Sequence, residues 1–233
     1  LAESNFYNLP QFRHEIHNYA FNYESKILRE ANQIGNFFNL IEQSFKAQQL
    51  MPMKSGFATK NFSDFRLLYR ATRDTFASSQ YHLKCDGKGS LLVIVKAKES
   101  KFIFGAYSEI GLVEPIKEGQ SNYENNRKDS FIFSLTNKKN EPTVHMIKSI
   151  KNKLQPSIHL NSQLGPTFGF NEFDLKICNN ANIVAQSSST LGNSYEFNPN
   201  KHGQQLISTD RSTYLAGARN FLVEEIEVFQ IVK

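Results

Sequence analysis

The most restrictive feature of this sequence is the apolar run at residues 91–95, Leu-Leu-Val-Ile-Val. Successive side chains of a strand point to opposite faces of its sheet, so an unbroken apolar run predicts a central strand covered on both sides. A second β-rich run at residues 102–107 follows after a short polar connection, which predicts a hairpin. The chain is therefore expected to place other elements on both faces of at least one sheet.

Other short strands are predicted on both sides of this hairpin. A strand at 65–69 precedes it, and the chain ends on a strand at 222–232. Residues 179–205 are rich in Asn, Ser and Gly and are predicted to form a long loop. Many short strands after one helical region predict an α+β, mostly β fold, a β-sandwich with flanking helices. The remaining predicted strands are at 131–135, 143–147 and 173–177.

The chain divides into residues 1–23, an arm or linker without a clear period, and one domain over 24–233. Apolar residues recur at steps of three and four after Ser25, which predicts a helix over 25–48 with Ser25 as its N-cap. This helix is expected to pack on the sandwich, although a detachable element offered to a partner groove is the competing interpretation. A second helix, capped by Asp74, is predicted to run to about Lys84.

The charge pattern argues against one class of partner, nucleic acids. The net charge is +5 and the pI is about 9.1, but the positive residues are scattered. A nucleic-acid binder typically has a basic stripe interleaved with exposed aromatics, so no nucleic-acid binding is predicted.

No apolar run approaches the roughly 18 residues that span a bilayer, so a soluble protein without membrane insertion is expected. Two cysteines far apart in sequence favour a reducing, cytoplasmic location.

The segment Lys84–Gly89 invites three interpretations. A phosphate loop would need a different glycine spacing, with a strand before the loop and a helix after it. A reactive thiol at Cys85 would be helped by nearby lysines but opposed by the helix C-terminus on which it is predicted to lie. A structural turn through Asp86, Gly87 and Gly89 is the favoured interpretation, because tight turns need positive φ angles. Redox activity at Cys85 remains the enzymatic alternative.

No other pattern predicts catalysis. The histidines do not form a tight ligand set with cysteines or carboxylates, so neither metal nor cofactor is expected. No nucleophile-elbow sequence is present. The chain is therefore predicted to act by binding another protein and not as an enzyme.

Charged residues at a strand-to-helix junction and in the final strand are the candidate partner contacts. Arg70 and Arg73 lie at a strand-to-helix junction, where they are either solvated or part of an ionic contact or partner surface. Glu225 and Glu227 share one face of the final strand, while Ile226 and Val228 share the other, inward face. The two carboxylates are predicted either to contact a partner or to form a structural salt bridge with an arginine.

Seven blocks occur in an order that resembles the TLDc domain, the module of the oxidation-resistance proteins and their relatives. The resemblance covers residues 24–233. The blocks are Ser25-Lys26-Ile27-Leu28, Leu67-Leu68-Tyr69-Arg70-Ala71-Thr72-Arg73-Asp74, Lys84-Cys85-Asp86-Gly87-Lys88-Gly89, Phe102-Ile103-Phe104-Gly105-Ala106-Tyr107, Phe131-Ile132-Phe133-Ser134-Leu135, Gly165-Pro166-Thr167-Phe168-Gly169 and Glu225-Ile226-Glu227-Val228-Phe229.

The resemblance implies a two-sheet antiparallel β-sandwich with helices at its sides and no accepted catalytic site. It also implies binding to the peripheral, cytosolic part of the vacuolar-type proton pump and a link to oxidative-stress resistance. A structural or adaptor role in a larger assembly, such as a cytoskeletal or ciliary one, is the alternative. Gly165 and Gly169 are expected to form a structural turn.

The chain departs from the family pattern at two places. Thr75 stands where the family commonly has glycine after Arg-Asp, and Phe170-Asn171-Glu172 replaces a glycine-rich run. The chain is thus expected to be a divergent member.

Overall fold

The structure is a computed structural model. The described residues are 24–32, 37, 40, 65–108, 121–124, 130–139, 142–146, 149–150, 153–154, 158–197 and 208–231. The predicted arm or linker at 1–23 lies outside them.

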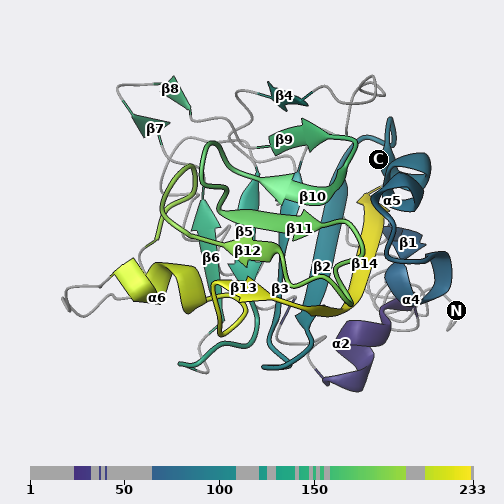
Figure 1. Ribbon diagram of the computed structural model, residues 1–233, viewed down its shortest axis with the longest axis horizontal. Helices are drawn as coiled ribbons and strands as arrows, with labels where there is room; N and C mark the ends of the chain where they lie inside the picture. The colour runs from purple at the N-terminus through teal and green to yellow at the C-terminus, as the bar shows by residue number, and fades with distance from the viewer. Residues whose placement is uncertain are drawn as a thin grey trace, which may run out of the picture.

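Two antiparallel sheets form the body of the molecule (Figure 1). Sheet A has the order β1-β14-β2-β3-β5-β6, and sheet B has the order β13-β12-β11-β10-β9-β4. The predicted two-sheet antiparallel sandwich is therefore confirmed. The strands of sheet A are β1 (Phe65–Arg70), β14 (Val223–Ile231), β2 (Leu91–Ala97), β3 (Ile103–Ser108), β5 (Phe131–Ser134) and β6 (Thr143–Met146). Those of sheet B are β13 (Asn220–Phe221), β12 (Ser187–Ser189), β11 (Leu175–Cys178), β10 (Leu164–Phe168), β9 (Ile158–Asn161) and β4 (Ser121–Glu124), and β7 (Ser149–Ile150) pairs with β8 (Lys153–Leu154).

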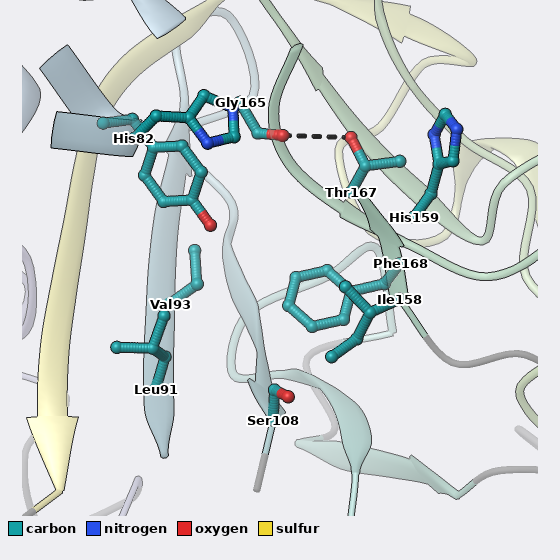
Figure 2. A pocket seen from close by; sticks show the side chains of 10 residues that line it. His82, Leu91, Val93, Ser108, Ile158, His159, Gly165, Thr167 and Phe168 are labelled. Atoms are coloured by element: carbon teal, nitrogen blue, oxygen red, sulfur yellow. Dashed lines mark hydrogen bonds between the residues drawn. The ribbon is translucent and has the colours of Figure 1, made fainter. Parts of the chain in front are cut away.

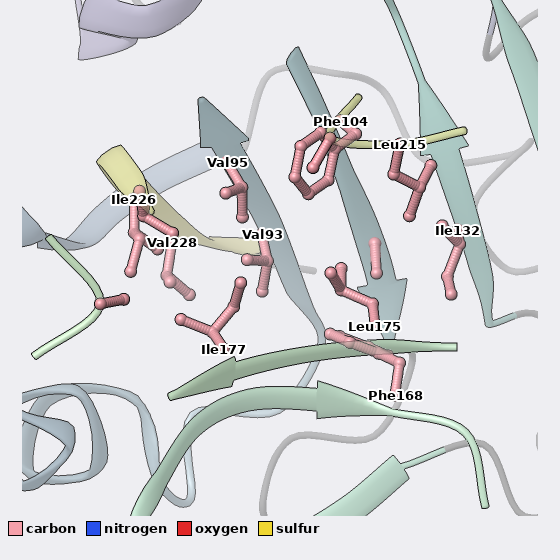
Figure 3. Packing of buried hydrophobic residues seen from close by; sticks show 14 of the residues in the cluster. Val93, Val95, Phe104, Ile132, Phe168, Leu175, Ile177, Leu215, Ile226 and Val228 are labelled. Atoms are coloured by element: carbon pink, nitrogen blue, oxygen red, sulfur yellow. The ribbon is translucent and has the colours of Figure 1, made fainter. Parts of the chain in front are cut away.

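The main hydrophobic core lies between the two sheets (Figure 3). Val93 and Val95 of β2 point into it, and Leu175 and Ile177 of β11 meet them from sheet B. The final strand contributes its predicted inward face, because Ile226 and Val228 belong to the same cluster.

Sheet A is covered on its outer face as well. Leu92 and Ile94, the alternate residues of β2, are fully buried in a second cluster with Ile27, Leu28 and Phe37 of the N-terminal region. The prediction that β2 is buried on both faces is therefore confirmed. A one-residue shift of β2 would exchange its two apolar faces between the two hydrophobic clusters.

The N-terminal helical region is interrupted after Glu30, where one continuous helix over 25–48 was predicted. Residues 33–36, 38–39 and 41–48 of that prediction lie outside the described residues. Helix α2 covers Lys26–Glu30, and its N-cap is Ser25 as expected. Asn32 has a φ of 53°, a left-handed conformation that ends the helix. Phe37 and Leu40 again have helical backbone. Burial of Ile27 and Leu28 agrees with the predicted packing of this region on the sandwich.

The predicted second helix is divided into two short helices. α4 covers Ala71–Asp74 and α5 covers Ser78–Cys85, with Ala77 as the N-cap of α5. Asp74 is thus the last residue of α4 and does not cap α5, because its carboxylate accepts the backbone N–H of Arg70. A third helix, α6, covers Ser208–Thr213.

The predicted loop over 179–205 contains strand β12 at Ser187–Ser189. Serine-rich sequence has low β propensity, but these residues pair with both β11 and β13. Among the described residues, no helix combines the length and the apolar character needed to cross a membrane.

Candidate functional site

Glu227 is the centre of a buried ionic cluster on the outer side of sheet A. It lies on β14, has no exposed surface, and is surrounded by hydrogen-bond donors from α2 and β1. Its carboxylate accepts the Ser25 hydroxyl at 2.7 Å, the Lys26 backbone N–H at 2.8 Å and Arg70 Nε at 2.9 Å. Burial raises the pKa of Glu227 above its ordinary value, while Ser25 and Arg70 oppose that rise.

Ser25 links Glu227 to the start of α2. Its Oγ donates to Glu227 and also accepts the backbone N–H of Leu28 at 3.3 Å. The Ile27 N–H points to the same carboxylate at 3.4 Å. One acidic side chain therefore satisfies, directly or through Ser25, several N–H groups that the first turn of a helix leaves unpaired.

Glu225 has the same kind of role at the start of α4. It is 3% exposed, and its Oε1 accepts the Thr72 backbone N–H at 3.0 Å. Its second oxygen accepts the Thr72 hydroxyl, and Lys26 Nζ lies 3.8 Å away. The two carboxylates and their partners form one group, the β14 carboxylate cluster, which consists of Ser25, Lys26, Arg70, Thr72, Glu225 and Glu227.

This geometry bears directly on the two interpretations of Glu225 and Glu227. Both side chains are buried and bonded to their own chain, and the Arg70–Glu227 ion pair is the structural salt bridge that was the alternative. A direct partner contact by either carboxylate stays a prediction, and for Glu227 it would require α2 to move away. Thr72 was not anticipated as a member, and no signal in the sequence pairs it with Glu225.

The two predicted arginines have different environments. Arg70 is largely covered, with 21% of its side chain exposed, because it crosses to Glu227 and also donates to the Glu24 carbonyl. Arg73 is 47% exposed and is bonded to Asp74 at 2.7 Å and to the Leu68 carbonyl. Arg73 is therefore accessible to a partner, and its predicted contact role stays a prediction.

Asp74 holds the junction between β1 and α4. Burial works to raise its pKa, but Arg73, the Arg70 N–H and Lys84 outweigh this effect and bring the pKa to about 2. Asp74 is thus ionised at neutral pH, and its carboxylate interacts with the Arg73 and Lys84 side chains and with the Arg70 backbone N–H.

Cys85 has the properties of a structural cysteine. Its side chain is fully buried in the main core. Burial, with Asp86 and Asp74 nearby, raises the pKa of the thiol far above its ordinary value. Since the thiolate is the reactive form, this geometry weighs against the Cys85 redox alternative.

The predicted turn after α5 is present. Asp86 follows the last residue of α5, and Gly87 and Gly89 have φ angles of 71° and 78°. Gly169 also has a positive φ, 96°, and a Cβ there would lie 2.4 Å from the Asp174 carboxylate. Gly165 does not lie in a turn: it is inside β10, where it packs against Ile177.

Next to this turn, His82 joins α5 to sheet B. Its Nδ1 lies 3.0 Å from Asp86 Oδ1, and its Nε2 lies 2.9 Å from the Leu164 carbonyl and 3.1 Å from the Asn161 carbonyl. Both ring nitrogens face acceptors, so the doubly protonated ring satisfies all of them. Burial lowers the pKa of His82, but Asp86 and the carbonyls outweigh burial, and the net pKa is raised.

A small cavity lies between the sheets beside His82 (Figure 2). Its volume of about 20 Å³ is room for about one water molecule, not for a cofactor. Thr167 donates to the Gly165 carbonyl at 3.1 Å on its wall. Its other lining residues include Tyr81, His82, Ser108, His159 and Phe168.

A second buried polar network, around His145 of β6, was not anticipated. His145 Nε2 and Thr143 Oγ1 are 3.1 Å apart, and the Thr143 hydroxyl is 3.2 Å from that of Tyr214. The ring of His145 stacks on Phe197. Burial lowers the pKa of His145 to about 4, so the neutral ring joins β6 to two later segments of the chain. Their sequence separation hides this network from any local pattern.

In the portion of the chain that the structure describes, no three His, Cys, Asp or Glu side chains gather closely enough to hold a metal ion. The blocks seen in the sequence instead supply strand pairing, helix capping and turns.

The sequence model of the TLDc domain matches residues 37–232. The chain belongs to the TLDc domain family. A search of curated proteins gave no match.

The TLDc pattern gains a physical explanation at the places where this chain departs from it. Thr75, at the position where the family commonly has glycine, has a φ of 74° and a ψ of 159°. Only glycine adopts this conformation without strain. In the segment Phe170-Asn171-Glu172, which replaces the glycine-rich run, Asn171 has a positive φ angle of 61°, and Phe173 directly after it has one of 49°. Thr75 and Asn171 therefore adopt the positive φ angles that favour glycine, although neither residue is glycine.

Proposed function

We propose that this TLDc domain is a non-enzymatic protein-interaction module that regulates the vacuolar-type proton pump by binding its peripheral, cytosolic sector. The observation that supports this proposal most directly is the TLDc match over residues 37–232. Pump regulation and a role in oxidative-stress resistance are what resemblance to this family implies, and a cytoplasmic location follows from the same proposal.

The environments of the polar residues in the family blocks favour binding over catalysis. Glu225 and Glu227 are occupied by donors of their own chain, and Cys85 is buried with a raised pKa. A catalytic group must reach its substrate in the required protonation state, and these three side chains do not meet that condition. Protection from oxidative stress would then act through a partner.

The test is direct binding of the full-length protein to the purified peripheral sector of the pump. We expect saturable binding in biolayer interferometry and a change in the ATPase activity of that sector. A matched negative control is the Gly105→Val variant, because a Cβ at residue 105 would lie 2.0 Å from the Val93 carbonyl and should prevent folding. Absence of binding by the folded protein would refute the pump proposal.

Two alternatives to pump regulation predict different results in related experiments. A structural or adaptor role predicts recovery of tubulin-associated or ciliary proteins from native lysate, without pump subunits. Redox activity at Cys85 predicts loss of peroxide protection in cells when Cys85→Ser is introduced, whereas the interaction proposal predicts unchanged protection.

A further inference from the structure

A groove opens at the end of the sandwich where β2 turns into β3, beside strand β13. Its volume is about 460 Å³, within the size range of ordinary ligand sites. Strand β13 crosses in front of the lower end of sheet A in Figure 1. We call the hollow the β13 groove, and it is lined by residues of the β2–β3 connection of sheet A, by Lys138 and Ala185, and by residues between 216 and 222, in β13 and its flanks.

Several of the residues that line the β13 groove have small side chains. Ser100 comes from the β2–β3 turn, and Ala216 and Ala218 come from the segment that leads into β13. Gly217 has a φ of 81°, and a Cβ there would lie 3.1 Å from Ser100 Cβ, so glycine permits this close approach. These small side chains leave room for the backbone of a bound segment, and Phe102 and Leu222 supply apolar walls.

An exposed apolar side chain lies near the groove in the same loop as one of its lining residues. Ile183 is 73% exposed, two positions before Ala185, which lines the groove. A single exposed aliphatic side chain is common on protein surfaces, so Ile183 adds apolar contact area only if the bound segment extends past Ala185.

The rim of the groove carries an excess of positive charge. Lys98, Lys101 and Arg219 are exposed, as is Lys138, which lines the groove itself. Glu224 is bonded to Lys96 at 2.8 Å and to Lys101, so its charge is already balanced. Glu99 is the acidic residue that lines the groove. This imbalance favours an acidic ligand.

The backbone beside the groove is suited to an extended chain. Among the described strands, β13 is an edge of sheet B and pairs with β12 only. The edge of a sheet can accept an added strand through main-chain hydrogen bonds. Because β13 has two residues, such a ladder is short, and the rim charges and apolar walls must provide much of the affinity.

From these observations together we propose that the β13 groove binds an extended, acidic segment of a protein partner that carries at least one apolar side chain. The proposal rests on the proposed function as an interaction module and adds the chemistry of the bound segment. A nucleic acid would also be attracted by the lysines, but a sheet edge with apolar walls favours polypeptide, and nucleic-acid binding is an outcome that would contradict the proposal.

The test uses a fluorescein-labelled heptapeptide of alternating glutamate and leucine with the whole protein. We expect saturable binding in fluorescence anisotropy that weakens with added salt, because exposed charges are screened. Amide signals of residues 98–102 and 216–222 should shift in NMR spectra of the labelled protein. The double variant Lys138→Glu/Arg219→Glu should bind about tenfold more weakly, since it reverses two rim charges.

Lys88→Glu is the matched control. Lys88 is exposed and precedes Leu91, whereas Lys98 follows Ala97, so the two lysines lie at opposite ends of β2, about 20 Å apart. Peptide binding should be unchanged in this variant. Equal loss in Lys88→Glu, equal binding of a lysine–leucine peptide, tighter binding of an oligothymidine, or absence of saturable binding would each overturn the proposal.

The peptide assay also separates this inference from the proposed pump regulation. If the protein binds the peptide but not the peripheral sector of the pump, the groove proposal stands and the proposal of pump regulation is refuted. If the protein does not bind the peptide, and the double variant Lys138→Glu/Arg219→Glu still binds the pump sector normally, the pump proposal stands and the groove proposal is refuted.

Discussion

The hydroxyl of Ser25 donates a 2.7 Å hydrogen bond to Glu227, a residue 202 positions later in the chain. This contact joins the first described helix to the last strand, at a point where sheet A is covered on its outer face. Because Glu227 also binds Arg70 of β1, three segments that are distant in sequence meet at one carboxylate.

Replacing Glu227 with glutamine should lower the free energy of unfolding by about 3 kcal/mol, because it leaves Arg70 without its partner in a buried site. Urea denaturation measures this change. The amides of Lys26 and Ile27, which donate to Glu227, should lose hydrogen-exchange protection in the variant.

Glu224→Gln is the matched control for that variant, since Glu224 lies on the same strand but is 33% exposed and pairs with Lys96 and the exposed Lys101. Its effect should be about 0.5 kcal/mol or less. Equal destabilisation by the two variants would show that the buried carboxylate has no special role in stability.

Thr75→Gly should increase the free energy of unfolding by about 1 kcal/mol, because glycine removes the strain of a threonine with positive φ. The Tyr69 hydroxyl, which donates to the Thr75 carbonyl at 2.7 Å, should keep the same backbone in the variant. Thr75→Ala keeps the Cβ and should give no increase. If alanine stabilises as much as glycine, backbone strain is not the cause.

His82 should make the domain less stable as the pH rises. Its pKa is raised in the folded state, so the folded protein binds the proton more tightly than the unfolded chain does. The stabilisation is fully present below the unfolded pKa of about 6.5 and is lost as the pH rises through the folded pKa. Urea denaturation across this range should show the loss, and His82→Gln should remove it.

His145 provides the opposite case for NMR titration of the histidine rings. Its pKa is lowered to about 4, so its contribution is lost as the pH falls from about 6.5 toward that value. The ring of His82 should titrate above about 6.5 and that of His145 well below it. A His82 pKa at or below its ordinary value would contradict the bonding of both its nitrogens to acceptors.

The thiols of Cys85 and Cys178, which are both free and buried, should not react with a disulfide reagent in the native protein. Raised pKa and burial of Cys85 both suppress formation of an accessible thiolate. Absorbance of the released thiolate measures the reaction, and guanidinium should expose both cysteines. Rapid modification of Cys85 in the folded protein would revive the redox alternative.

Local patterns were sufficient to predict the strands of sheet A, strand β11 of sheet B and the turn at Gly87 and Gly89, but not the other strands of sheet B. The apolar run at 91–95 indicated a central strand, and the alternation of Ile226 and Val228 identified the inward face of β14. These predictions succeeded because periodicity and turn conformation depend on neighbouring residues. Ser25 as an N-cap belongs to the same class.

Only the tertiary structure decided what the polar side chains do. The sequence left open whether Glu227 contacts a partner or pairs with an arginine, and the structure shows that it pairs with Arg70 and accepts donors from the start of helix α2. The division of the helix at Asn32, strand β12 and the network around His145 also depend on partners distant in the chain. Burial and pairing of a charge are set by segments brought together in folding, and a local pattern carries no record of them.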